Sequence, residues 1–272
     1  MNRAPIQKRI VAATQRTAEA VLGVARQVRL GGGSLLLPPA CAACQVSLAA
    51  DGAESGVSWV PLLCEGCRGE LGQCFSTCPR CASRDPGTAS DGRCMACRDR
   101  RFRFSWAVAL GMYEGKLRDA VLRTKLPTEH CLTANLAELL WERHGQRLAA
   151  FRPDAVIAVP MHWWRRLRRG GNGPDIVCEA ISRRLGVQSA PNLLARRRNT
   201  VPQSNLAHGR RRLNLRHAFR VRSSYVLNGA RLILVDDILT SGATAHEAAA
   251  TLRKAGAAEV VVAVIARANR PA

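Results

Sequence analysis

The densest group of reactive side chains in this sequence is an acidic pair followed by small and hydroxyl residues, at positions 236–244. The carboxylates of Asp236 and Asp237 suit the hydroxyls of a ribose or a Mg²⁺ ion. Residues 240–244, which we call the phosphate loop, offer hydroxyls and backbone N–H groups where a predicted helix begins, and the helix dipole favours an anion there. The phosphate loop consists of Thr240, Ser241, Gly242, Ala243 and Thr244. Such a site would hold both ends of a ribose 5-phosphate.

Individual residues of the phosphate loop have distinct expected roles. Gly242 lets the backbone approach a phosphate closely. Thr240 and Ser241 can donate to phosphate oxygens, and Thr244 can join them or cap the helix. The plain alternative is an ordinary turn from strand to helix, in which the Asp, Ser and Thr side chains serve only as caps.

Eight of the eleven cysteines form four C-x-x-C pairs. One such pair supplies two thiolates to a metal ion, and a second pair completes a tetrahedron, so the spacing predicts two structural Zn²⁺ sites. Sequential pairing is assumed, and an interleaved pairing and iron–sulfur ligation stay open. A disulfide framework is disfavoured, since no export signal is evident. The predicted metal ligands are Cys41, Cys44, Cys64, Cys67, Cys78, Cys81, Cys94 and Cys97.

A second candidate anion site follows the apolar run at 154–159. A loop rich in arginine at the carboxyl end of a strand is suited to pyrophosphate, because guanidinium groups pair with phosphate oxygens in two-pronged geometry. The candidate pyrophosphate loop contains Met161, His162, Arg165, Arg166 and Arg169. Asn172 is expected to cap the helix that follows.

The elements that must position these residues alternate between strand and helix. Strands are predicted at 103–113, 154–159, 231–235 and 259–265, and helices at 117–125, 132–148, 175–185 and 245–255. This alternation predicts an α/β fold with a parallel sheet and helices on both faces. Ligands of such sheets bind at the carboxyl ends of the strands, where the acidic pair falls.

The charge of the chain points to polyanionic partners. The 272 residues carry a formal net charge of +21. Residues 142–222 hold eighteen arginines against four acidic residues. Pyrophosphate, a nucleotide or nucleic acid would suit such a segment, and Trp163 and Trp164 could stack on single-stranded bases. The alternative is a set of solvated arginine faces.

No apolar run is long enough to cross a membrane, so a cytoplasmic protein is expected. Residues 1–37 predict a basic, amphipathic helix or extension. Polar residues interrupt any signal-peptide core in it. An organelle transit peptide and a helix that lies on a membrane surface are the alternatives to a helix docked on the protein itself.

Several of these motifs occur in one order that resembles the competence protein F family. They are residues 38–44, 63–67, 159–162 and 200–203, together with 234–244. The resemblance implies a zinc-ribbon module fused to a type I phosphoribosyltransferase fold, which binds phosphoribosyl pyrophosphate with Mg²⁺. It also implies a cytoplasmic role in the uptake of single-stranded DNA during natural transformation, beside a helicase partner.

The resemblance also sets expected domain limits and marks departures. The chain divides into the extension at 1–37, a double zinc-ribbon module at 38–100 and a phosphoribosyltransferase-like domain at 101–268, with a basic hood at about 191–230. Gly171 and Gly173 stand where the family usually has Phe and Gln, and Lys125-Leu126-Pro127 replaces a Lys-Phe-Arg-like stretch. The pyrophosphate loop is therefore a weaker match than the phosphate loop.

Three functions fit this sequence. The first is an accessory protein of DNA uptake that keeps a ribose-phosphate site. The second is an active phosphoribosyltransferase of the amido or orotate type. Transfer to 6-oxopurines is disfavoured, because enzymes of that kind have an acid at the position of Thr240, which cannot exchange a proton at neutral pH. The third is a zinc-dependent scaffold for a protein partner.

Overall fold

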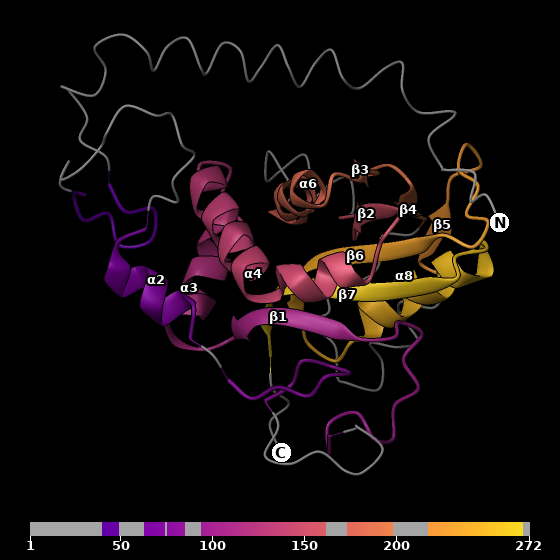
Figure 1. Cartoon of the computed structure of the whole chain (residues 1–272), viewed down its shortest axis with the longest axis horizontal. Helices are drawn as coiled ribbons and strands as arrows, with labels where there is room; N and C mark the ends of the chain where they lie inside the picture. Colours follow the sequence, from indigo (N-terminus) through magenta and orange to yellow (C-terminus); the bar gives the residue numbers. More distant parts are fainter. Residues whose placement is uncertain are drawn as a thin grey trace, which may run out of the picture.

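The computed structural model describes residues 40–48, 63–73, 75–84, 94–161, 173–197 and 217–268. Its centre is a parallel sheet of five strands in the order β1-β7-β6-β2-β3. The strands are β1 (Ala107–Met112), β2 (Ala155–Ala158), β3 (Gln188–Ser189), β6 (Arg231–Leu239) and β7 (Glu259–Arg267). The predicted α/β fold with a parallel sheet is confirmed (Figure 1).

Burial explains the composition of the central strands. β7 reads Val-Val-Val-Ala-Val-Ile-Ala after its first residue, and every one of these side chains is buried. A continuous apolar run of this kind is typical of a parallel strand that is covered on both faces. β6 extends to Leu239, beyond the predicted end at residue 235, so the acidic pair lies within the strand rather than after it.

Helices cover the two faces of the sheet as predicted. One face packs against α3 (Gly115–Arg123), α4 (His130–Ala150) and α6 (Gly173–Leu185). The other face packs against α8 (Ala243–Lys254), which buries Ala243, Ala245, Ala248, Ala249 and Leu252 on the sheet. In Figure 1, α4 and α6 lie in front of the strands and α8 lies behind them. Successive β6 residues alternate between these two cores, as a strand requires.

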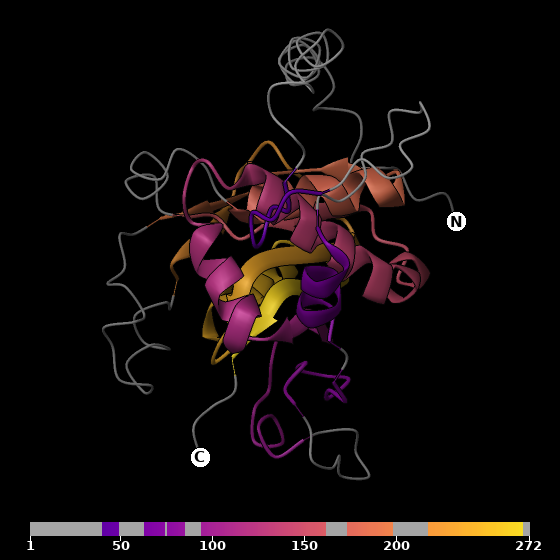
Figure 2. The ribbon, with the colours of Figure 1, turned by 90° about the vertical axis from the view of Figure 1, so that its left-hand side faces the viewer.

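The cysteine-containing segments dock at two separate places on this domain. The first contains the short helix α2 (Glu65–Leu71), and it packs on the core that α3 and α4 share. The second, from Cys78 to Cys97, forms its own small core with Ala96 and Phe102. Figures 1 and 2 both show the second segment below the sheet and away from α2.

Part of the predicted basic hood forms a small ribbon outside the main sheet. The antiparallel strands β4 (Leu194–Arg196) and β5 (Phe219–Val221) pair with each other and pack on the α8 side. Residues 198–216 and the predicted extension at 1–37 lie outside the described residues. The domain limits stay predictions. None of the described helices has the length and apolar character that a membrane span needs.

Candidate functional site

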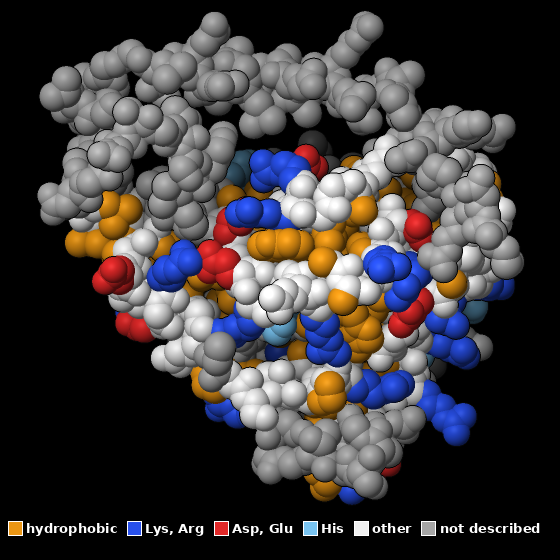
Figure 3. All heavy atoms as spheres, in the orientation of Figure 1, with side chains coloured by type: hydrophobic (Ala, Val, Ile, Leu, Met, Phe, Trp, Pro, Cys, Tyr) orange, Lys and Arg blue, Asp and Glu red, His pale blue; other side chains and the backbone are white. Residues whose placement is uncertain are grey.

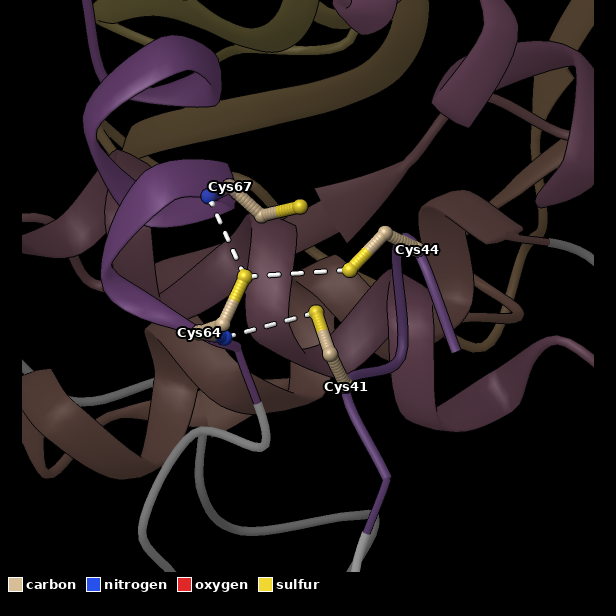
Figure 4. A group of neighbouring side chains, drawn as sticks. All are labelled: Cys41, Cys44, Cys64 and Cys67. Carbon is tan, nitrogen blue, oxygen red and sulfur yellow. Dashed lines mark hydrogen bonds between the residues drawn. The ribbon is translucent and has the colours of Figure 1, made fainter. Parts of the chain in front are cut away.

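The structure brings the eight cysteines together in the two groups of four that sequential pairing predicts. We call Cys41, Cys44, Cys64 and Cys67 the first cysteine cluster, shown in Figure 4. Its Sγ atoms point toward one another, and those of Cys44 and Cys64 are 3.7 Å apart. The backbone N–H of Cys64 donates to the Sγ of Cys41 at 3.3 Å, and the N–H of Cys67 donates to the Sγ of Cys64 at 3.4 Å. These amides stabilise thiolates at the start of α2.

The second cysteine cluster, Cys78, Cys81, Cys94 and Cys97, is buried at all four positions. The Sγ of Cys78 lies 3.8 Å from that of Cys97, and the Sγ of Cys81 lies 3.6 Å from that of Cys94. The first cluster differs, because Cys44 is exposed and Cys64 is half-buried.

The spacing of the sulfur atoms fits one tetrahedral metal ion in each cluster. Four thiolates bound at about 2.3 Å to Zn²⁺ have Sγ atoms about 3.8 Å apart. The observed separations of 3.6–3.8 Å match this value and are far too long for disulfides. Within each cluster all four ligand atoms lie within 4.8 Å of one another, which leaves room for a single ion rather than a larger iron–sulfur cluster.

Two thiols of the first cysteine cluster have pKa values that differ from those of free cysteines. Burial raises the pKa of Cys41, but backbone N–H groups of Cys44, Cys64 and Ala43 lower it further, to about 6. Burial and the neighbouring thiols raise the pKa of Cys67. Cys41 thus loses its proton more readily than a free cysteine, and a metal must displace protons from the other thiols when it binds.

The phosphate loop joins β6 to the N-terminus of α8. Gly242 occupies the N-cap position in the left-handed conformation, with φ of 75°, so no side chain caps the helix from that position. The Ser241 hydroxyl accepts from the N–H of Ala243 at 3.3 Å, and the N–H of His246 donates to the carbonyl of Gly242 at 2.8 Å. Thr244 therefore stands inside the helix, and the alternative in which it is the cap is wrong.

The acidic pair lies half-buried near the end of β6, two residues before this loop. Burial and the charge of Asp237 raise the pKa of Asp236 well above its usual range, while Arg196 of β4 opposes the shift. The Asp236 carboxylate accepts from the N–H of Asp237 at 2.9 Å, and the Asp237 carboxylate accepts from the N–H of Ile238 at 2.8 Å. Burial and the charge of Asp237 both disfavour the ionised form of Asp236, so a bound cation or hydroxyl donors would favour that form.

Three residues that contact the phosphate loop were not predicted from the sequence. Arg267 donates to the carbonyls of Leu239 and Thr240, and Arg100 donates to the carbonyl of Ser241. The ring of Phe102 lies against Gly242. No local pattern could reveal these contacts, because they join residues that are distant in the chain.

The candidate pyrophosphate loop is described only at its first residue. Met161 lies half-buried just after β2, at the same edge of the sheet as the phosphate loop. His162, Arg165, Arg166 and Arg169 lie outside the described residues, as does Asn172.

Several arginines of the basic segment bond to other parts of the fold. Arg143 donates to the carbonyls of Leu110 and Gly72, Arg147 donates to that of Pro79, and Arg184 pairs with Glu138. On the face shown in Figure 3, the Lys and Arg side chains of the described residues are interspersed with Asp and Glu. Nine of the eighteen arginines at 142–222 lie outside the described residues.

We expect Gly242→Ala to destabilise the protein and to weaken phosphate binding. A Cβ at Gly242 would lie 2.7 Å from the ring of Phe102, in addition to the cost of about 1–2 kcal/mol for a left-handed L-residue. Gly186→Ala is the matched control, because Gly186 has φ of 65° and no atom near its added Cβ. Thermal melts should show a larger fall for Gly242→Ala, by roughly 2–4 °C for each further kcal/mol. Equal losses of melting temperature in the two variants would show that the Phe102 ring moves aside at no cost in stability.

Comparison with known proteins gives one consistent picture. The family model described as "Phosphoribosyl transferase domain" matches residues 177–272, which include β6, the phosphate loop and α8. Competence protein F of Haemophilus influenzae is 32% identical over 210 residues, covering 76% of this chain and 90% of that protein. DNA utilization protein YhgH of Escherichia coli O157:H7 is 32% identical over 220 residues, covering 75% and 96%. The protein of that name from Salmonella typhimurium is 29% identical over 231 residues, covering 84% and 96%. The extent of these matches, and the fold that accompanies them, show that the chain belongs to the competence protein F family.

Proposed function

We propose that the β6–α8 junction binds a ribose 5-phosphate ligand of the phosphoribosyl pyrophosphate type, together with Mg²⁺. The observation that carries this proposal is the placement of an acidic pair near the carboxyl end of β6, with the left-handed Gly242 five residues beyond Asp237 at the N-cap of α8. A dication or ribose hydroxyls would suit the acids, and the N–H groups and hydroxyls of the loop would suit the 5-phosphate. The match to a phosphoribosyl transferase domain over the same residues supports it.

Each residue of the site has a defined role in this proposal. Asp236 and Asp237 hold the ribose hydroxyls and, through them, the metal. Thr240, Ser241 and Thr244 donate hydroxyl hydrogens to the phosphate, and Gly242 and Ala243 contribute backbone N–H groups. Met161, His162, Arg165, Arg166 and Arg169 are proposed to hold the pyrophosphate. Zinc is the metal that we propose for both cysteine clusters, with a structural role, because four thiolates leave no open coordination position.

We further propose that the protein assists the handling of single-stranded DNA in the cytoplasm, beside a helicase. The names of its relatives, a competence protein and DNA utilization proteins, support this role. The formal charge of +21 supports it as well, since a cationic surface attracts a polyphosphate chain. Binding to single-stranded DNA should then weaken steeply as the salt concentration rises.

An active transferase is the second candidate, and the acidic pair at the ribose site favours it. With Thr240 in place of an acid, the acceptor would be an amine or an orotate-like base rather than a 6-oxopurine. Release of pyrophosphate, measured across a panel of amines and nucleobases, would demonstrate it.

Calorimetric titration with phosphoribosyl pyrophosphate, with and without Mg²⁺, tests the main proposal. We expect saturable binding that depends on Mg²⁺, and a melting temperature that rises with ligand concentration. Ribose 5-phosphate should bind more weakly, because it lacks the pyrophosphate. If titration releases no heat of binding and the ligand does not raise the melting temperature, the ribose-phosphate site is excluded and the zinc-dependent scaffold is favoured.

A further inference from the structure

Three consecutive carbonyl groups at the start of the phosphate loop accept hydrogen bonds from arginines. Arg267 donates to the carbonyl of Leu239 at 2.7 Å and also to that of Thr240. Arg100 donates to the carbonyl of Ser241 at 2.6 Å. In a planar trans peptide the C=O and the following N–H point in opposite directions. The arginines therefore turn the N–H groups of residues 240–242 toward the opposite side, where an anion would lie.

The same Arg267 side chain also bonds to the second cysteine cluster. Its Nε donates to the carbonyl of Cys81 at 2.9 Å, and the residue is only 4% exposed. Burial lowers the pKa of this guanidinium, and the charges of Cys81, Cys94 and Cys97 raise it. Four thiolates around one Zn²⁺ carry a net charge of 2 − 4 = −2, which a buried arginine offsets. The buried guanidinium of Arg267 thus connects the second cysteine cluster to the phosphate loop.

The segment that leaves the second cysteine cluster makes two further contacts with the loop. Arg100 follows Cys97 by three residues and bonds to Ser241. Phe102 packs on the cluster itself and places its ring under Gly242. In Figure 1 the chain leaves β7 beside the purple segment that carries Cys78 and Cys81. The loop is therefore supported from below by the cluster and by the residues that follow it.

We propose that the second cysteine cluster holds the phosphate loop in its anion-binding shape, with Arg267 and Arg100 as the positioning residues that couple the two. The part of this inference that concerns ligand affinity rests on the proposed ribose-phosphate site. The part that concerns the shape of the loop does not. Loss of metal from the second cluster should then loosen the loop, even though no cysteine of that cluster belongs to it.

Amide hydrogen exchange of peptides spanning 236–246 tests the coupling directly. Arg100→Gln removes the bond to Ser241 at a partly exposed position, so this variant is expected to fold. Exchange in the loop should rise at least about tenfold, while exchange in α4 stays unchanged. Arg267→Gln should act more strongly, and Arg100→Lys should restore part of the protection. Cys94→Ser, which removes a ligand of the second cluster, should loosen the same peptides.

Arg123→Gln is the matched control. Arg123 donates to the carbonyls of Ala42 and Ala43, which lie between Cys41 and Cys44, so it supports the first cysteine cluster from the main domain in the same way. This change should leave exchange at 236–246 unaltered. The coupling is overturned if Arg100→Gln and Cys94→Ser leave the loop protected, or if Arg123→Gln loosens it equally.

Ligand binding separates this inference from the proposed function. If the wild type binds phosphoribosyl pyrophosphate, Arg100→Gln should weaken binding about tenfold without a matching change in metal content. If the wild type does not bind it, the proposed function fails, and the exchange data alone decide whether the cluster shapes the loop.

Discussion

Replacing both Asp236 and Asp237 with Asn is expected to weaken Mg²⁺-dependent binding of phosphoribosyl pyrophosphate by about a hundredfold or more. Each lost charged hydrogen bond contributes about 1.5–3 kcal/mol, and about 3 kcal/mol corresponds to roughly a hundredfold in affinity. Asn keeps the side-chain oxygen that accepts from the next backbone N–H, so the strand should be preserved. Calorimetric titration measures the effect. Unchanged affinity in the double variant would show that Asp236 and Asp237 do not bind the ligand.

The same change at Asp236 alone should stabilise the protein without ligand at neutral pH. Burial and the neighbouring Asp237 raise the pKa of Asp236 in the folded chain. Between the unfolded and folded pKa values, the folded state binds more protons, so stability falls as pH rises through that window. Asp236→Asn removes this loss. Its melting temperature should exceed that of the wild type at pH 7 and converge with it in acid. A lower melting temperature at pH 7 would contradict the raised pKa of Asp236.

Purified protein is expected to contain about two zinc ions per chain, and a chelator should release them in two well-separated phases. The first cysteine cluster exposes Cys44 to solvent, whereas every ligand of the second is buried. Release from a buried site requires local opening, which a surface site does not need. A chromogenic chelator should therefore show one ion leaving at least about tenfold faster than the other.

Substitution of one ligand in each cluster assigns the two phases. Cys44→Ser should remove the fast phase and leave about one zinc that departs slowly. Cys94→Ser should remove the slow phase and also lower the melting temperature more, because the second cluster supports both its own core and the phosphate loop. A single phase of two ions, or the reverse assignment, would show that burial does not control release.

Much of the candidate site could be predicted because its signals are local. A C-x-x-C pair defines its own knuckle, so the pairing of Cys41 with Cys64 and of Cys78 with Cys94 needed only sequence order. The apolar runs before Pro160 and Asp236 are strand-length, which predicted β2 and β6. Alternation with helices then placed the acidic pair at one edge of the sheet.

What could not be predicted depends on contacts between distant residues. The end of β6 at Leu239 is set by pairing with Arg267 of β7, a partner that no local window contains. The contact of Arg267 with Cys81 spans 186 residues. Arginines 143 and 147 counted toward a basic surface in the sequence, yet they bond to backbone carbonyls of distant segments. Amino-acid composition cannot distinguish an arginine that stabilises the fold from one that binds a ligand.

The position of β7 in the sheet has a consequence for synthesis on the ribosome. It is the last of the described strands in the chain, yet it lies between β1 and β6. Within the described residues, β1 has no other strand partner. The hydrophobic β1 must therefore wait without a strand partner until β7 has emerged, which makes the nascent chain vulnerable to aggregation during that interval.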